Sequence, residues 1–143
     1  MADEKISAMP AVTAAGLSDL VPIVQSGVNM SVTPALLAQV QRGITADTDG
    51  STITFDASLN DKHSVTLGGN RTLAVSNDYD GQVVTLILKQ DSTGTRTVTW
   101  FSGILWPGGT VPTLTTTPSK TDVFSFIRVS SGHYLGFIVG QNL

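Results

Sequence analysis

Apolar and polar residues alternate with a period of two through much of the chain after residue 50. The alternation is clear at 51–56, 63–67 and 71–75, and this period is typical of strands with one buried face. The segment 82–89 is apolar on both faces, which predicts a central strand. Turn-forming Gly, Asn, Asp and Ser residues separate these runs. The pattern therefore predicts an all-β domain over 50–143, an antiparallel β-sandwich of jelly-roll type.

Two pairs of these runs are predicted to form antiparallel hairpins. The first joins 82–89 to 96–101, and the second joins 122–129 to 133–139 across a Ser-Ser-Gly turn. Short, glycine-containing connections between alternating runs are the usual sequence signal of a hairpin. Thr and Val, whose β-branched side chains favour strands, are the commonest residue types in the chain.

Residues 1–46 lack a regular apolar period and are interpreted as an extended N-terminal arm. The segment 19–25 predicts a short extended piece, because Pro22 has no backbone N–H and restricts the residue before it. A tight turn at 27–29 is expected to lead into a second short strand at 30–32.

One short helix is predicted within the arm, at about 33–42. Thr33 is a favourable N-cap, Pro34 suits the first helical position, and Gly43 is a natural stop. So short a helix needs a partner surface to be stable. The arm either folds back on its own domain or docks on neighbouring subunits. The residues predicted to anchor it are all apolar: Ile6, Leu20, Val21, Ile23, Val24, Leu36 and Leu37.

The composition indicates a protein that makes extensive contacts with other proteins. Of 143 residues, 41% are hydrophobic, enough for a compact core, whereas only 13% are charged, about half the usual share. The net charge of −3 is not clustered, so the basic patch of a nucleic-acid binder is missing. No apolar run reaches the length of a membrane span and the first residues lack a signal-peptide profile, so no membrane association is expected.

Candidate catalytic or metal-binding chemistry is sparse. Asp47 and Asp78 open acidic turns that resemble calcium loops, but their twelfth positions are Ser58 and Lys89 instead of a bidentate Glu. Ordinary Asp-Gly turns are therefore favoured over metal sites. Neither histidine has a ligand partner at strand or helix spacing, and the chain has no cysteine. No catalytic residue, metal site or cofactor is predicted, and the protein is not expected to be an enzyme.

The run Trp106-Pro107-Gly108-Gly109 predicts a tight turn. Pro107 fixes its own φ, and Gly108 or Gly109 then adopts a positive φ without a steric clash. Trp106 is thereby expected to be held in the core beside Trp100, the commoner role of aromatic residues in a small β-domain. The alternative is an exposed sugar-stacking platform formed by four aromatic residues: Tyr79, Trp100, Trp106 and Tyr134.

Three stretches of the second half are distinctive. They are 81–100 with its Leu-Ile-Leu-Lys-Gln-Asp-Ser-Thr-Gly core, 106–117 beginning Trp-Pro-Gly-Gly-Thr, and the ending 140–143. With them, the stretch 68–143 resembles a domain that recurs in tailed-bacteriophage virion proteins, especially tail-fibre and related appendage proteins. The arm, at 5–10 and 19–27, is similar to the N-terminal segment of many phage structural proteins.

The resemblance implies a non-enzymatic virion structural protein. It would be made in the bacterial host cytoplasm, form a homotrimer, and contact other virion proteins such as the major capsid, neck or tail proteins. Fibres with this domain have a long shaft between arm and tip, whereas here the two are almost adjacent. A capsid decoration or cement protein, or a short head-fibre or collar appendage, is therefore favoured. The alternative is a tail-fibre or baseplate component whose β-domain binds a host glycan.

Overall fold

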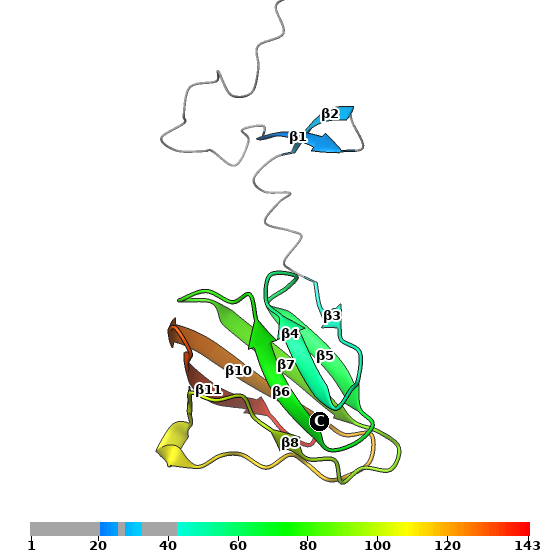
Figure 1. The fold of residues 1–143 in the computed structure, drawn as a ribbon. Helices are drawn as coiled ribbons and strands as arrows, with labels where there is room; N and C mark the ends of the chain where they lie inside the picture. The colour runs from blue at the N-terminus through cyan, green and yellow to red at the C-terminus, as the bar shows by residue number, and fades with distance from the viewer. Residues whose placement is uncertain (1–20, 26–27, 33–42) are drawn as a thin grey trace, which may run out of the picture. The chain divides into compact units, whose positions relative to one another are not determined.

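The computed structural model describes residues 21–25, 28–32 and 43–143 (Figure 1). The chain divides into two compact units, Met1–Val40 and Gln41–Leu143. Within the described residues, the regular structure is β-strand, apart from one short 3₁₀ turn. The predicted all-β class is therefore confirmed.

The first unit contains a two-stranded antiparallel hairpin of β1 (Val21–Gln25) and β2 (Val28–Val32). Both short extended segments agree with the sequence prediction. Val28 and Asn29, however, already belong to β2, where they pair with Gln25 and Val24. The turn predicted at 27–29 is therefore wrong.

The second unit consists of two sheets that face each other across one hydrophobic core (Figure 1). The large sheet has the strand order β3-β5-β7-β10-β11-β9, and the small sheet has the order β4-β6-β8. The strands in chain order are β3 (Thr45–Ala46), β4 (Thr52–Asp56), β5 (Lys62–Leu67), β6 (Arg71–Ser76), β7 (Val83–Gln90), β8 (Val98–Thr99), β9 (Ile104–Leu105), β10 (Thr121–Ser130) and β11 (His133–Gly140).

From β3 to β8 the chain winds alternately through the two sheets. β3, β5 and β7 lie in the large sheet, whereas β4, β6 and β8 lie in the small one, and every neighbouring pair within this set is parallel. Parallel neighbours need a crossover connection between them. Here the crossover is a strand of the opposite sheet, the principle on which β-helical folds are built.

The predicted antiparallel arrangement holds only for part of the large sheet. β10 is antiparallel to both β7 and β11, so the predicted C-terminal hairpin is confirmed. The hairpin predicted between 82–89 and 96–101 is wrong, because β7 pairs with β5 and β10 while β8 pairs with β6. The chain passes from the large sheet to the small one between β7 and β8, and the buried side chain of Gln90 holds this connection. Its amide donates to the Arg96 carbonyl (2.9 Å) and accepts from the Arg96 N–H (2.8 Å).

The core is filled by alternate residues of both sheets, as the period of two predicts. On β7, Val84, Leu86 and Leu88 are buried, whereas Val83 and Lys89 are exposed. β7 is thus central in its sheet, as predicted, but only one of its faces lies in the core. The largest fully buried apolar side chains are Phe55, Phe124, Phe126, Ile53, Leu67, Leu73, Leu86 and Leu88.

The boundary between arm and β-domain lies earlier than predicted. Thr45 pairs with His63 and Ala46 with Ser64, so β3 belongs to the large sheet. The division falls between Val40 and Gln41 instead of at residue 46. A two-residue strand is too short to show a period, which is why the sequence gives no sign of it. The helix predicted at 33–42 lies outside the described residues.

A close backbone contact joins the β8–β9 connection to the C-terminal hairpin, and it generates a prediction. Gly103 has φ +80°, and a Cβ on it would lie 1.8 Å from the Gly132 carbonyl oxygen. Gly103→Ala should lower the free energy of unfolding, measured in urea, by at least about 2 kcal/mol more than Gly108→Ala. Gly108 also has a positive φ, +65°, but a Cβ on it would meet open space. Gly108→Ala is therefore the control that measures backbone strain without a steric clash. Equal effects of the two substitutions would contradict the prediction.

Candidate functional site

The arm hairpin contains three of the predicted anchoring residues. Val21, Ile23 and Val24 lie in β1, and the other anchoring candidates, Ile6, Leu20, Leu36 and Leu37, lie outside the described residues. Val21 pairs with Val32 and Ile23 with Met30, so apolar residues meet at alternate positions of the two strands. An isolated two-stranded hairpin is at best marginally stable in water. A two-stranded hairpin of this kind gains stability from a surface that covers it.

The second unit contains an aromatic cluster that extends the core beyond the small sheet. Trp100 lies 4.8 Å from Phe124 and 5.2 Å from Trp106 between ring centroids, with the rings edge to face. Phe101 contacts both Phe126 (5.0 Å) and Tyr134 (4.9 Å) in the same manner. Edge-to-face pairs of this kind add to the free energy gained by burial. The members of the cluster are Trp100, Phe101, Trp106, Phe124, Phe126 and Tyr134.

The Trp106-Pro107-Gly108-Gly109 turn places Trp106 where the sequence leads one to expect it. Trp106 is 9% exposed, and both glycines have positive φ, +65° and +69°. The Gly109 N–H donates to the Trp106 carbonyl (2.9 Å), which closes the turn. Gly136 of β11 faces the indole, because a Cβ there would lie 2.8 Å from the Trp106 ring. The turn therefore places the Trp106 indole against β11, in space that is free because residue 136 is a glycine.

The four aromatic residues considered for a sugar platform are not gathered on the surface. Trp106 and Tyr134 are buried, and Trp100 is half-buried within the aromatic cluster. Tyr79 is exposed, on the connection before β7. A sugar ring requires a flat aromatic face open to solvent. The arrangement in the structure therefore offers no four-residue stacking platform.

Buried Asp122 fastens the long connection after the turn and the C-terminus to β10. Its carboxylate accepts hydrogen bonds from the backbone N–H of Thr115 (2.6 Å) and of Asn142 (2.9 Å). The Gln141 side chain donates to the same carboxylate (3.3 Å) and to the Thr113 carbonyl (2.7 Å). Sequence reasoning did not single out Asp122. It lies two residues before Phe124, in phase with the inward-facing Phe124 and Phe126 of β10, and this spacing is the signal that it faces inward.

The first acidic turn holds two windings of the chain together. The carboxylate of Asp47 lies 3.0 Å from Nδ1 of His63, and that of Asp49 accepts from the Arg71 guanidinium (2.8 Å at Nε). The hydrogen bonds from Arg71 hold the pKa of Asp49 below its usual range, whereas burial raises the pKa of Asp47, and the interaction with His63 opposes this rise. These aspartates thus act as partners for side chains of β5 and β6.

His63 is fully buried, and both of its ring nitrogens are engaged. Nδ1 faces Asp47, Nε2 lies 2.9 Å from the Asn60 carbonyl oxygen, and the ring meets Phe55 edge to face at 5.5 Å. A general base must reach the proton that it removes from a substrate. In this structure the ring is closed off from solvent, so His63 acts as a packing residue with satisfied polar atoms.

The second acidic turn is tied to the C-terminal hairpin. Asp78 is 2.6 Å from the Arg128 guanidinium and accepts a 2.7 Å hydrogen bond from the Tyr134 hydroxyl. Nε of Arg128 also lies 3.1 Å from the Asp80 carboxylate. Among the described residues, no group of three or more His, Cys, Asp or Glu side chains has the arrangement of a metal site. Both acidic turns therefore have an ion-pair role in the fold.

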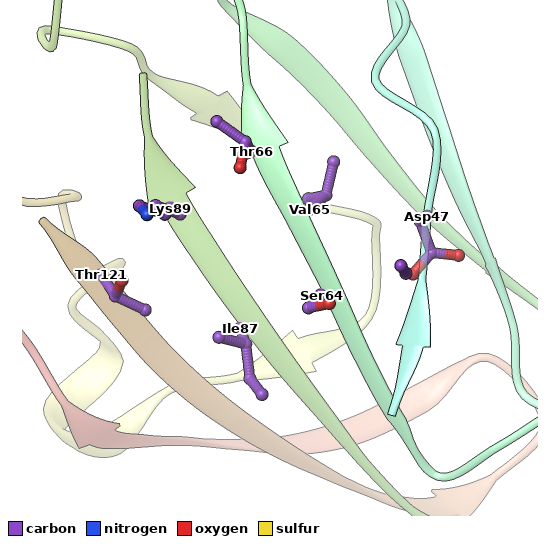
Figure 2. A pocket seen from close by; sticks show the side chains of 8 residues that line it. Asp47, Ser64, Val65, Thr66, Ile87, Lys89 and Thr121 are labelled. Carbon is purple, nitrogen blue, oxygen red and sulfur yellow. The ribbon is translucent and has the colours of Figure 1, made fainter. Parts of the chain in front are cut away.

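A shallow hollow of about 380 Å³ lies on the outer face of the large sheet. Figure 2 shows Ser64 and Thr66 of β5 beside Ile87 and Lys89 of β7, with Thr121 of β10 across from them. The Ser64 hydroxyl donates to the backbone carbonyl of Thr45 (3.4 Å), which is not a base that could activate it. This hollow has the hydroxyl-rich composition of an ordinary sheet surface.

Comparisons with protein-family models, with curated proteins and with solved structures find no match for this chain. The described residues contain no helix that is long and apolar enough to cross a membrane.

The first prediction from this site concerns the aromatic cluster. Trp106→Ala should lower the free energy of unfolding by about 3–5 kcal/mol, because it empties a large buried site between β10 and Gly136. Urea denaturation followed by circular dichroism measures this loss. Val111→Ala, on the same connection but 57% exposed, is the control and should change stability by less than about 0.5 kcal/mol. An unchanged midpoint for Trp106→Ala would contradict a core role.

The second prediction concerns Tyr134. Burial and the hydrogen bond to the Asp78 carboxylate raise the pKa of Tyr134 from 10.0 to about 12. The folded state thus favours the neutral phenol, and this contribution is complete below pH 10 and is lost as the pH rises towards 12. The stability advantage of the natural protein over Tyr134→Phe should narrow between these pH values. A constant difference across that range would refute the assignment.

Proposed function

We propose that this chain is a structural protein of a tailed-bacteriophage virion that attaches through its N-terminal arm. The favoured place is the head, as a capsid decoration or cement protein, or a short head-fibre or collar appendage. Its expected partners are the major capsid, neck or tail proteins, and its action is mechanical: it covers and joins apolar surfaces of neighbouring subunits.

The arm hairpin is the observation that carries this proposal. It belongs to a unit separate from the β-domain, and apolar residues pair at alternate positions along it. Because two strands alone do not bury enough apolar surface to be stable, a hairpin of this composition gains its stability by docking. A compact domain preceded by such a segment suits a protein that is fastened to a larger particle.

The hydrogen-bonded polar side chains in the core of the β-domain also support a structural role. Its polar side chains in the core, His63, Gln82, Gln90 and Asp122, all have hydrogen-bond partners within the fold. Each of them ties strands or connections together. The domain is thus built as a rigid support, which is what a cement or appendage protein requires.

The alternative is a tail-fibre or baseplate component whose β-domain binds a host glycan. The half-buried face of Trp100, beside a groove lined by Val98, Pro112 and Leu114, is the place where a sugar could stack. The burial of Trp106 and Tyr134 leaves that place with one aromatic residue, so we favour the anchoring function. Within that function we propose that the protein is a homotrimer.

The arm prediction is tested by attachment to virus particles that lack the protein. Deleting residues 1–40 should leave the thermal midpoint of the β-domain unchanged, because the deletion ends at the boundary between the two units. Attachment, measured by co-sedimentation with the particles, should fall at least about tenfold.

A matched pair of full-length variants separates docking from chain length. Ile23→Asp places a charge at an apolar cross-strand pair, whereas Ser31→Asp places it at a polar position of the same hairpin. The first should abolish attachment, and the second should leave most of it. Full occupancy by the truncated protein would refute the anchoring role.

A further inference from the structure

The outer face of the large sheet is apolar at the end formed by β7, β10, β11 and β9. Ile127 of β10 pairs with Val83 of β7 on one side and with Leu135 of β11 on the other. Leu135 in turn pairs with Leu105 of β9. Directly paired residues of neighbouring strands point to the same face of a sheet. Four aliphatic side chains therefore form one row across four strands.

This row is part of an apolar patch that lies open to solvent within the described unit. Leu105 is 60% exposed, Val129 48%, Val83 45% and Phe137 42%. Beside them is an apolar recess of about 320 Å³, lined in part by Leu105, Leu135 and Phe137. Single exposed apolar residues are normal, but a contiguous group of them marks an interaction surface. The apolar patch consists of Val83, Leu105, Ile127, Val129, Leu135 and Phe137.

The strand edge next to the patch is also open. β9 pairs only with Tyr134 and Leu135, so the part of β11 from Gly136 to Gly140 has no strand partner on that side among the described residues. Along it, Ile138 and Val139 are at least half exposed. Proteins that stay monomeric usually protect such an edge with charged residues or proline. This edge carries neither.

We propose that the apolar patch is the surface through which copies of this chain meet around the axis of the homotrimer, an inference that rests on the proposed function. Around a symmetry axis, identical surfaces approach one another, so like charges would repel. The patch holds no charged residue. The lysines of the outer face, Lys62 and Lys89, lie on β5 and at the opposite end of β7 from Val83, and Figure 2 shows Lys89 among hydroxyl side chains.

The size of the face suits a second copy. Strands of two, six, eight, ten, eight and two residues, with a rise of about 3.3 Å per residue and a spacing of about 4.8 Å, give the outer face an area of roughly 570 Å². Each partner in a standard stable interface buries about 800 Å². The patch would supply the apolar centre of that interface, and the Thr and Ser side chains over β5, β7 and β10 would supply its polar rim.

Light scattering of the full-length protein coupled to size-exclusion chromatography tests the proposal. The natural protein should elute as a trimer. Leu105→Lys and Phe137→Lys should each weaken self-association at least about tenfold, because a lysine would be desolvated in the interface without a partner. Leu59→Lys is the matched control: Leu59 is 56% exposed but lies on the connection between β4 and β5, and this variant should remain trimeric. Near-ultraviolet circular dichroism of the tryptophans should be unchanged in all three variants.

The outcomes separate this inference from the proposed function. A trimer that survives both patch substitutions, or that dissociates equally in Leu59→Lys, overturns the patch as the trimer surface and leaves arm attachment untouched. A monomeric natural protein overturns the trimer and its surface together. A trimer that depends on the patch but does not attach to particles supports this inference and refutes the anchoring function.

Discussion

The fold depends on covering the inner face of β10 and β11, because the small sheet has only three strands with which to cover six. Phe124 and Phe126 of β10 would be left open without the aromatic side chains of the segment after β8. Trp100, Phe101 and Trp106 fill this space as irregular chain, not as a further strand. The Asp122 carboxylate then fastens the following connection by accepting a backbone N–H, which a buried carboxylate requires.

The winding of strands β3 to β8 imposes a second constraint, since each turn of the chain must be held to the next. Hydrogen-bonded side chains do this at two of the connections between the sheets: Asp47 with His63 and Asp49 with Arg71 from the β3–β4 connection, and Gln90 with the backbone of Arg96 between β7 and β8. Exposed ion pairs contribute little to stability, but a buried polar group without a partner costs much more. Their role is therefore to fix the path of the chain.

The proposed contacts of this protein rest on apolar residues outside the core. The arm hairpin pairs apolar residues at alternate positions, and the β-domain exposes an apolar row beside an open strand edge. The two features call for different partners. The proposed virion structural role would account for both features, with the hairpin docked on the particle and the apolar row facing copies of the same chain.

The sequence by itself determined the longer strands of the β-domain and the alternation of their inward residues, because burial on one face imposes a period of two on the side chains themselves. It also indicated the turn at Trp106, since Pro107 and two glycines restrict the backbone locally, and the C-terminal hairpin, whose strands are joined by two residues. Only the tertiary structure decided that β7 and β8 belong to different sheets. A period of two is the same for parallel and antiparallel neighbours, so it does not show which strands pair. The hydrogen bond from the Arg96 N–H to the Gln90 side chain forms only after the chain has passed from β7 in the large sheet to β8 in the small one.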